Sequence, residues 1–378
     1  MIAPSEFCDL LQEQGIDFYC GVPDSLLKNL CEHIDQNTSA SNHIITANEG
    51  NSIAMASGYH LSTGKAAMVY MQNSGMGNTV NPLTSLADPE VYSIPMLMVI
   101  GWRAEPGVKD EPQHVKQGAI STQLLDVLDI PYVVLDKTSP LDELPELLAK
   151  MYAENRPVAV LVKKSVFTKS AAKTASTEAS LGQDELMLRE QALSTVLTAL
   201  PKEALVISTT GKTSRELFEL RKAQGDVCAD FLTVGAMGHA SSIAMGAALG
   251  SPDRQVVVID GDGALLMHMG AMPIIGAHKV KNLLHILLNN GCHESVGGQA
   301  TVANTLDIPS IASSCAYVHS AKVSKSEDIQ ASIAQFVGVK SGPNLLEISV
   351  KPGSRDDLGR PTETPVANKM AFMAKAKQ

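Results

Sequence analysis

The chain has 378 residues, an apolar share of 44% and a formal net charge of −10 at pH 7. The length predicts two domains, and the acidic balance disfavours nucleic acid and anionic membranes as partners because both carry negative charge. There is no signal-peptide pattern and no apolar run long enough for a membrane span. The six cysteines form no CxxC pair and are too sparse for a disulfide framework, so we expect reduced thiols and a cytoplasmic protein.

The first half of the chain alternates between strand-like and helix-like stretches. Apolar runs predict buried parallel strands at 44–47, 67–71, 96–100, 132–135 and 158–162. A helix is predicted at 142–152, where Pro145 falls in the first turn and is therefore tolerated. These elements predict a doubly wound α/β domain over 1–166.

The composition changes in the middle of the chain. Residues 167–183 are rich in Ala, Ser, Thr and Lys without periodicity, which predicts a solvated linker. A helix from about Asp184 and further βα units predict a second doubly wound domain over 184–378, with strands at 204–208, 231–234, 255–259, 283–288 and 345–350. The pattern of 368–378 fits either a helix or a frayed tail.

Polar residues follow several of the predicted strands in the first domain. Asp24, in the run Gly-Val-Pro-Asp-Ser, precedes a helix and has the position of an N-cap. Glu49 opens the helix after 44–47, where a carboxylate ordinarily only complements the helix dipole. Asn73 lies in a glycine-rich turn, which allows backbone to approach a ligand closely. His114 lies among charged and turn residues, where a histidine is ordinarily solvated.

The most informative feature of the second domain is a pair of motifs at strand ends. Gly261-Asp262-Gly263 forms a tight turn between the strand 255–259 and a helix predicted at 264–275, and Asn289-Asn290-Gly291 ends the strand 283–288. Ligands of open α/β sheets bind at such strand ends. Carboxylate, amide and carbonyl oxygens suit Mg²⁺, and the helix starting at Ala264 offers N–H groups to an anion. The alternative is that both residues only cap backbone groups.

Three further segments follow strands of the second domain. Thr210 and Gly211 lie between a strand and a helix and offer a hydroxyl and amides to a diphosphate, without the spacing of a P-loop. Gly235 and Met237 follow the strand 231–234, and the ordinary role of such a methionine is core filling. The polar, glycine-rich run 291–299 suits a substrate-facing loop.

The GDG motif followed by NN after 25 intervening residues resembles the signature of the thiamine diphosphate-dependent decarboxylases. This resemblance implies that Asp262, Asn289 and the Gly291 carbonyl hold Mg²⁺. It implies that Glu49 bonds the pyrimidine ring and drives proton transfer. It also implies that Asp24 and His114 act as catalytic groups. The remaining cofactor contacts that it implies are Asn73, Thr210, Gly211, Gly235, Met237, Gly261, Gly263 and Ala264.

The same resemblance implies a domain arrangement and an assembly. The first domain corresponds to the pyrimidine-binding domain, the second to the diphosphate-binding domain, and the chain has no room for the middle domain of larger relatives. In the family the cofactor lies between domains of two subunits, so we expect a homodimer or larger oligomer.

The runs 72–88, 92–118 and 353–361 resemble the phosphonopyruvate decarboxylase family. This implies conversion of 3-phosphonopyruvate to phosphonoacetaldehyde in phosphonate biosynthesis. The alternatives are a sulfopyruvate decarboxylase, a decarboxylase of simple 2-keto acids, and a catalytically silent thiamine diphosphate-binding subunit. An anionic substrate requires cations. The candidates are Arg355 and Arg360, then Lys109 and Lys116, with Arg103 also considered and with backbone N–H groups of a helix expected near Ser295.

Overall fold

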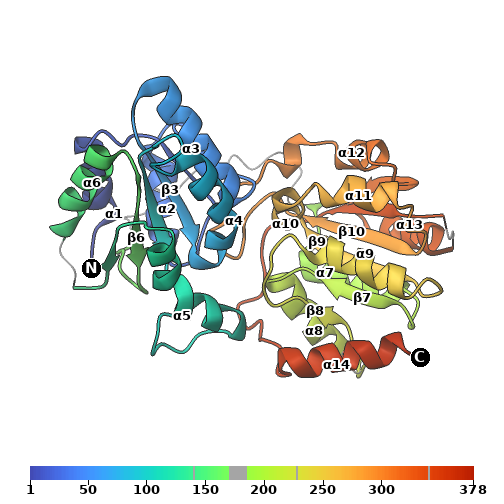
Figure 1. Ribbon diagram of the computed structural model, residues 1–378. Helices are drawn as coiled ribbons and strands as arrows, with labels where there is room; N and C mark the ends of the chain where they lie inside the picture. The colour runs from blue at the N-terminus through green and yellow to red at the C-terminus, as the bar shows by residue number, and fades with distance from the viewer. Residues whose placement is uncertain (139–140, 170–184, 227–228, 339–340) are drawn as a thin grey trace. The chain divides into compact units, whose positions relative to one another are not determined.

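The computed structural model describes residues 1–138, 141–169, 185–226, 229–338 and 341–378. The chain divides into two compact units, Met1–Thr177 and Glu178–Gln378 (Figure 1). Most of the predicted linker lies outside the described residues, so the exact domain limits stay a prediction. Among the described residues, no helix combines the length and the apolar character that crossing a membrane requires.

Unit 1 is built on one sheet of six parallel strands in the order β2-β1-β3-β4-β6-β5. The strands are β1 (Tyr19–Gly21), β2 (His43–Ile45), β3 (Ala67–Gln72), β4 (Met96–Gly101), β5 (Tyr132–Leu135) and β6 (Pro157–Val162). The helices are α1 (Pro4–Glu13), α2 (Lys28–Asn37), α3 (Glu49–Thr63), α4 (Met76–Pro82), α5 (Pro112–Val127) and α6 (Glu143–Glu154). A short 3₁₀ turn, Asn73–Gly75, joins β3 to α4.

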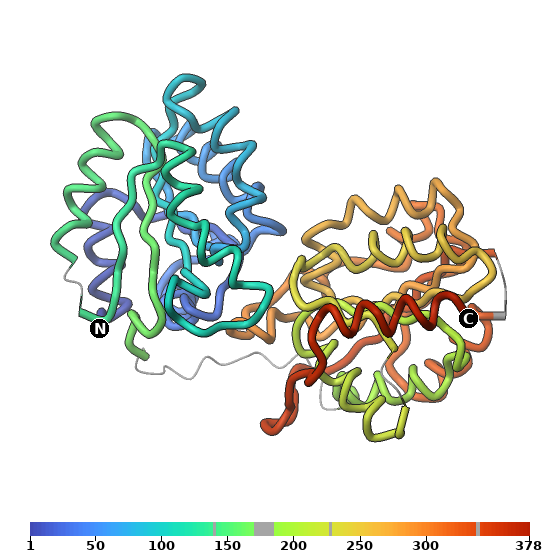
Figure 2. Tube along the Cα trace, turned by 60° about the horizontal axis from the view of Figure 1, so that its bottom comes forward, coloured from blue at the N-terminus to red at the C-terminus, as the bar shows by residue number. Residues whose placement is uncertain are grey.

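Both faces of this sheet are covered, which explains the continuous apolar runs of its strands. Successive residues of β3 alternate between two cores: Met68 packs with residues of α1, α2 and α6, and Val69 packs with residues of α3 and α5. Figure 2 shows the helices on either side of the strands in each unit. A strand buried on both faces needs no alternation of polar and apolar residues, so it can be apolar along its whole length.

Unit 2 repeats the architecture with the order β11-β12-β10-β9-β7-β8. The strands are β7 (Leu205–Ser208), β8 (Phe231–Leu232), β9 (Val256–Gly261), β10 (Leu283–Asn289), β11 (His319–Val323) and β12 (Asn344–Ser349). The helices are α7 (Arg189–Ala199), α8 (Lys212–Ala223), α9 (Ala240–Gly250), α10 (Asp262–Met267), α11 (Ala271–Ala277), α12 (Ile308–Ser314), α13 (Ser326–Gly338) and α14 (Pro365–Ala376). Residues of α7, α8 and α13 pack on one face and residues of α9, α11 and α12 on the other.

The predicted fold class, two doubly wound parallel-sheet domains, is confirmed, because every strand pairing in both sheets is parallel. Several local predictions were wrong. The predicted helix 264–275 is two helices, broken at 268–270, and α10 begins directly at Asp262 with no intervening turn. Strand β11 was missed because its burial is partial and its apolar pattern weak. Asp184 lies outside the described residues, and the helix expected from there begins at Arg189. Of the two alternatives for 368–378, the helix is found, at Pro365–Ala376.

Candidate functional site

Asp262 lies at the carboxyl end of β9 and is only 3% exposed. Its Oδ2 accepts a hydrogen bond of 2.5 Å from the Thr301 hydroxyl. Burial raises the pKa of this carboxyl to about 6, and the groups that oppose the rise are the Thr301 hydroxyl and backbone amides of Asp262, Gly263 and Asn290. The strongest influences on Asp262 therefore include no basic side chain, and the surroundings of this buried carboxylate fit a ligand of a cation.

Asn289 ends β10, and the strand register pairs its predecessor Leu288 with Gly261. The Asn289 Nδ2 donates to Glu347 at 2.8 Å, while its Oδ1 accepts from the backbone N–H of Gly291 at 3.0 Å. Gly291 has a φ of +69°, and a side chain there would collide with Asn304. The left-handed backbone therefore favours glycine at 291, and a side chain there would also displace the Asn304 amide.

The two strand ends bring the predicted ligands of Mg²⁺, Asp262, Asn289 and Gly291, to one edge of the sheet of unit 2. No group of three or more His, Cys, Asp and Glu side chains in the described part of the chain could hold a metal ion. A divalent cation here would therefore depend on Asp262 together with amide, carbonyl and cofactor oxygens. Such a hard-oxygen set fits Mg²⁺, which keeps few protein carboxylates and takes substrate or cofactor phosphates.

The predicted diphosphate loop lies at the end of β7. Gly211 is the N-cap of the twelve-residue helix α8 and has a φ of +95°. The Thr209 hydroxyl is buried and has no hydrogen-bond partner, and the Thr210 hydroxyl donates to the Val234 carbonyl at 2.9 Å. A Cβ at 211 would lie 3.3 Å from the Ser295 hydroxyl, so this loop approaches the loop that follows β10. The region around Ser295 is a turn, so the helix expected there is absent.

A partly buried carboxylate joins these two loops, and the sequence analysis missed it. Glu294 accepts hydrogen bonds from Lys212 (2.8 Å), Asn290 (2.9 Å) and Arg189 (2.6 Å). Arg189 is itself held by Glu216 through two bonds of 2.8 Å. The network fixes the start of α8 against the Asn289–Gly291 segment. The sequence showed Lys212 and Glu294 beside the motifs, but no spacing rule connected them.

Met237 lies half-buried beside the GDG motif. A Cβ at Gly263 would lie 3.4 Å from the Met237 methyl group and 2.9 Å from the ring of His293. Burial lowers the pKa of His293. Ala236 and Gly238 both have positive φ, so the backbone around Met237 is sharply turned after Gly235. The structure thus gathers Met237 and Gly263, together with a histidine that the sequence analysis did not select.

In unit 1, Glu49 is the first residue of α3 and is 6% exposed. Its Oε2 accepts a hydrogen bond of 2.7 Å from Asn78. A side chain at Gly75 would collide with the Glu49 carboxylate, so the glycine of the 72–78 segment makes room for this residue. Glu49 is therefore a buried, positioned carboxylate rather than a solvated helix-end charge.

Asp24 follows β1 and is 1% exposed. It is not the N-cap of α2, which is Leu27; its Oδ2 instead accepts from the Leu26 N–H at 3.0 Å, and its Oδ1 is buried without a hydrogen-bond partner. Burial raises the pKa of Asp24 to about 6, opposed by backbone hydrogen bonds and by the Arg103 guanidinium. A side chain at Gly101 would collide with this carboxylate.

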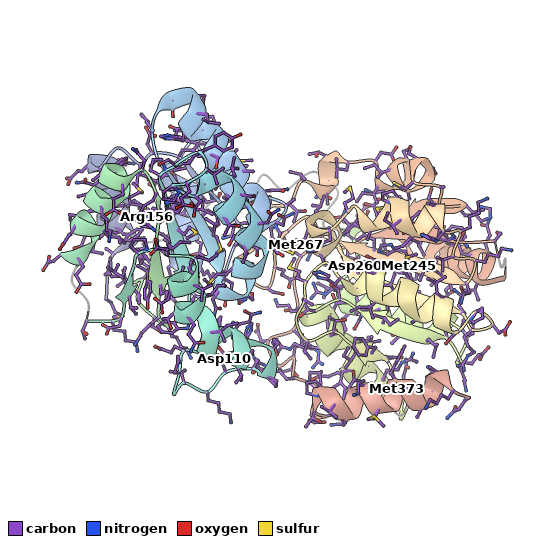
Figure 3. The ribbon with its side chains drawn as sticks, in the orientation of Figure 1. Asp110, Arg156, Met245, Asp260, Met267 and Met373 are labelled. Carbon is purple, nitrogen blue, oxygen red and sulfur yellow. The ribbon has the colours of Figure 1, made fainter. Side chains whose placement is uncertain are left out.

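His114 lies in the first turn of α5, because Pro112 starts the helix, and not in the turn segment that the surrounding residues suggested. Its Nδ1 is buried without a hydrogen-bond partner, and its pKa is lowered by burial and by the charge of Arg103. Arg103 binds Asp110 through Nε (2.7 Å) and Nη2 (2.5 Å), and its Nη1 donates to Ser25 at 3.2 Å. Figure 3 labels Asp110 at the start of α5.

Arg103 is held in place by a residue that was predicted to contact the cofactor. The Asn73 side chain is 1% exposed and bonds the backbone N–H and C=O of Arg103 at 3.2 and 3.0 Å, and it also donates to Ser121. A cofactor contact of Asn73 stays a prediction. Arg103 acts on both Asp24 and His114, so these three residues form one cluster at the carboxyl edge of the sheet.

The other predicted substrate cations lie elsewhere. Arg355, after β12, is paired with Glu190 (3.0 Å), Asp357 (3.1 Å) and Glu219. Three carboxylates around one guanidinium leave it poorly suited to a further anion. Arg360, Lys109 and Lys116 are exposed.

Comparisons with known proteins find relatives that match both units of the chain. The family model described as the N-terminal thiamine pyrophosphate-binding domain of thiamine pyrophosphate enzymes matches residues 5–126, and the corresponding C-terminal domain matches 209–348. A phosphonopyruvate decarboxylase of Streptomyces viridochromogenes is 36% identical over 99% of this chain and 95% of its own, and one of Streptomyces hygroscopicus is 35% identical over 97% and 92%. A sulfopyruvate decarboxylase of Methanosarcina acetivorans is 28% identical over 96% and 94%.

Proposed function

We propose that this chain, which belongs to the thiamine pyrophosphate enzymes and among them to the phosphonopyruvate decarboxylase family, converts 3-phosphonopyruvate to phosphonoacetaldehyde and carbon dioxide. In this reaction the bond between the carboxylate and the keto carbon breaks and a proton takes the place of the carboxylate. The observation that carries the proposal is the buried oxygen set of Asp262, Asn289 and Gly291, in a chain similar over nearly its whole length to two phosphonopyruvate decarboxylases.

Asp262, Asn289 and the Gly291 carbonyl would hold Mg²⁺, and the loop around Thr210 and Gly211 would bind the diphosphate of the cofactor. The buried Thr209 hydroxyl, which has no hydrogen-bond partner, and the buried Asp262 carboxylate, which has no basic side chain among its strongest influences, both fit such a ligand. When bound, thiamine diphosphate supplies an electron sink for the pair released as carbon dioxide leaves.

Three residues of unit 1 would carry out the proton transfers of the reaction. Glu49 would hydrogen-bond the pyrimidine ring of the cofactor, and its carboxylate is already oriented by Asn78. Asp24 and His114 each present a buried atom without a partner, Oδ1 and Nδ1. Burial raises the pKa of Asp24 to about 6, towards the range where proton transfer at neutral pH is efficient, whereas burial lowers the pKa of His114 and so favours its neutral, proton-accepting form.

The phosphonate requires a cation, and the structure changes the order of the candidates. Arg103 donates three of its five N–H groups to Asp110 and Ser25, is 20% exposed at its side chain, and lies in the cluster of Asp24 and His114. We therefore propose Arg103 ahead of Arg355, whose guanidinium is occupied by three carboxylates. Two N–H groups remain for oxygens of the substrate.

The test is a side-by-side assay of phosphonopyruvate, sulfopyruvate and pyruvate with thiamine diphosphate and Mg²⁺. We expect kcat/KM for phosphonopyruvate to exceed that for pyruvate by at least about 10³, because more than one charge-assisted contact of roughly 2 kcal/mol is lost with pyruvate. Arg103→Met should reduce kcat/KM for phosphonopyruvate far more than for pyruvate, and Arg355→Met should reduce both alike. Equal efficiency on phosphonopyruvate and pyruvate would refute the substrate assignment.

The second candidate is sulfopyruvate decarboxylation. It is favoured by the 28% identity to a sulfopyruvate decarboxylase that the chain matches over 96% of its length. A sulfonate carries one negative charge whereas a phosphonate near neutral pH carries between one and two, so a higher kcat/KM for sulfopyruvate at pH 7 would select this alternative.

We also propose that the enzyme works as a homodimer or larger oligomer, with each active site formed by two subunits, as the family resemblance implies. We propose in addition that the enzyme takes part in phosphonate biosynthesis and is located in the cytoplasm.

A further inference from the structure

A buried carboxylate interrupts the apolar middle of a strand in unit 2. Glu347, in the middle of β12, is fully buried, and its neighbours Leu345, Leu346 and Ile348 belong to the two cores of the unit. Placing a carboxylate in such surroundings is costly unless it is paired and hydrogen-bonded. The cost indicates that Glu347 has a task that an apolar residue could not perform.

The strand register shows what Glu347 faces. Glu347 is paired with Leu287 of β10 on one side and with Lys322 of β11 on the other. Because side chains two residues apart share a face of a sheet, Asn289 lies on the same face as Leu287 and diagonally next to Glu347. The Glu347 Oε1 accepts hydrogen bonds from Asn289 Nδ2 and from Lys322 Nζ, each at 2.8 Å.

These contacts fix the orientation of the Asn289 amide. A carboxylate only accepts hydrogen bonds, so the amide nitrogen of Asn289 must face Glu347. The amide oxygen then points to the opposite side, where it accepts from the Gly291 N–H at 3.0 Å and keeps a second lone pair. A flipped amide would place its nitrogen at the proposed metal position and would lose the bond to Glu347.

We propose that Glu347 is a positioning residue of the metal centre, which orients Asn289 so that its oxygen faces Mg²⁺. This inference rests on the proposed function, because it takes Asn289 as a ligand of the cofactor's metal. Lys322 compensates the charge of Glu347, and its Nζ reaches the buried oxygen from the partly exposed strand β11.

The experiment measures the Mg²⁺ concentration that half-saturates thiamine diphosphate binding, by titration calorimetry on the full chain. Glu347→Met removes the acceptor and should raise this concentration about 10- to 100-fold, the usual effect of losing a partner of a metal ligand. Glu347→Gln keeps an acceptor oxygen for Asn289 and should change it by less than about threefold. Lys322→Met keeps the bond between Glu347 and Asn289 and is expected to behave like Glu347→Gln.

The Asn289→Asp background distinguishes the orientation of Asn289 by Glu347 from a purely structural role of Glu347. Two equivalent carboxylate oxygens need no orientation, and they repel Glu347, so adding Glu347→Met to Asn289→Asp should leave Mg²⁺ affinity unchanged or improve it. A loss of the same size in both backgrounds would overturn the inference, as would wild-type affinity of Glu347→Met. Failure of the proposed function has a different signature: wild type and Asp262→Ala would then show the same Mg²⁺ dependence.

Discussion

Units 1 and 2 share one topology but differ in the chemistry at the ends of their strands. Counted from its own first strand, each sheet has the order 2-1-3-4-6-5. In unit 1, the strand ends carry ionisable side chains: Asp24 after β1, Glu49 after β2 and Arg103 after β4. In unit 2, the residues predicted to contact the cofactor are mainly hydroxyls, amides and glycines, with Asp262 as the ionisable one. The shared topology supplies a ligand-binding edge in both units, and the side chains placed there decide its use.

The two buried aspartates make the contrast concrete. Burial raises the pKa of both Asp24 and Asp262 to about 6. Asp24 is influenced by Arg103 and keeps one oxygen without a partner, an arrangement suited to proton transfer. Asp262 is held by Thr301 and backbone amides and lies beside amide and carbonyl oxygens, an arrangement suited to a cation. The same rise in pKa therefore accompanies two different proposed roles, proton transfer at Asp24 and cation binding at Asp262.

The largest expected effect is that of Asp262→Ala on cofactor binding. Removing the only carboxylate of the proposed metal set should abolish Mg²⁺-dependent binding of thiamine diphosphate while the fold remains intact. Titration calorimetry and circular dichroism measure the two properties. Asp24→Ala is the matched control, since the same change in unit 1 should leave cofactor affinity near that of wild type. Unchanged affinity of Asp262→Ala would remove the metal assignment.

Glu49→Gln should bind the cofactor but decarboxylate more slowly by roughly 10²–10⁴, the usual contribution of a positioned proton-transfer group. The decisive measurement is the exchange of the cofactor C2 proton with deuterium. Glu143→Gln is the control, because Glu143 is also the first residue of a helix but is exposed. Exchange at the wild-type rate in Glu49→Gln would reduce Glu49 to a structural carboxylate.

Asp24→Asn should separate stability from activity. The folded-state pKa of about 6 lies above the ordinary value of 3.8, so the wild-type protein loses stability as pH rises through this window, by at most on the order of 3 kcal/mol. The asparagine variant has no proton to lose there. Thermal unfolding should therefore show it gaining stability relative to wild type from pH 3.8 to about 6, while its kcat falls. A difference in stability that does not vary with pH would contradict the assignment.

The smallest expected effect is a partial recovery of activity on mixing. Glu49→Gln and Asp262→Ala are each expected to be nearly inactive. If two subunits form each site, subunit exchange between equal amounts of the two variants should make about a quarter of all sites intact. About half of the dimers are then mixed, and each mixed dimer has one intact site and one doubly damaged site. Subunit exchange is verified with two affinity tags. Absence of recovery after proven exchange would favour a site formed within one chain.

The sequence alone determined the features that depend on local pattern. The apolar runs of β3, β4, β6 and β10 predicted their strands because strands buried on both faces need no other signal. The motifs around Asp262 and Asn289 predicted that these residues meet, because parallel strands end at one edge of the sheet. Where the pattern was weak, as in the partly exposed β11, or where the helix after β9 breaks, the local signal failed.

Only the tertiary structure decided which residues are partners across long sequence separations. Thr301 meets Asp262, Glu294 meets Arg189 and Lys212, and Glu347 meets Asn289, although nothing in the sequence links the members of each set. The same holds for the substrate cations: the sequence analysis ranked Arg355 ahead of Arg103. The fold surrounds Arg355 with three carboxylates and places Arg103 beside Asp24 and His114. The availability of a charge depends on its neighbours in space, and those neighbours come from distant elements that only the packed sheets bring together.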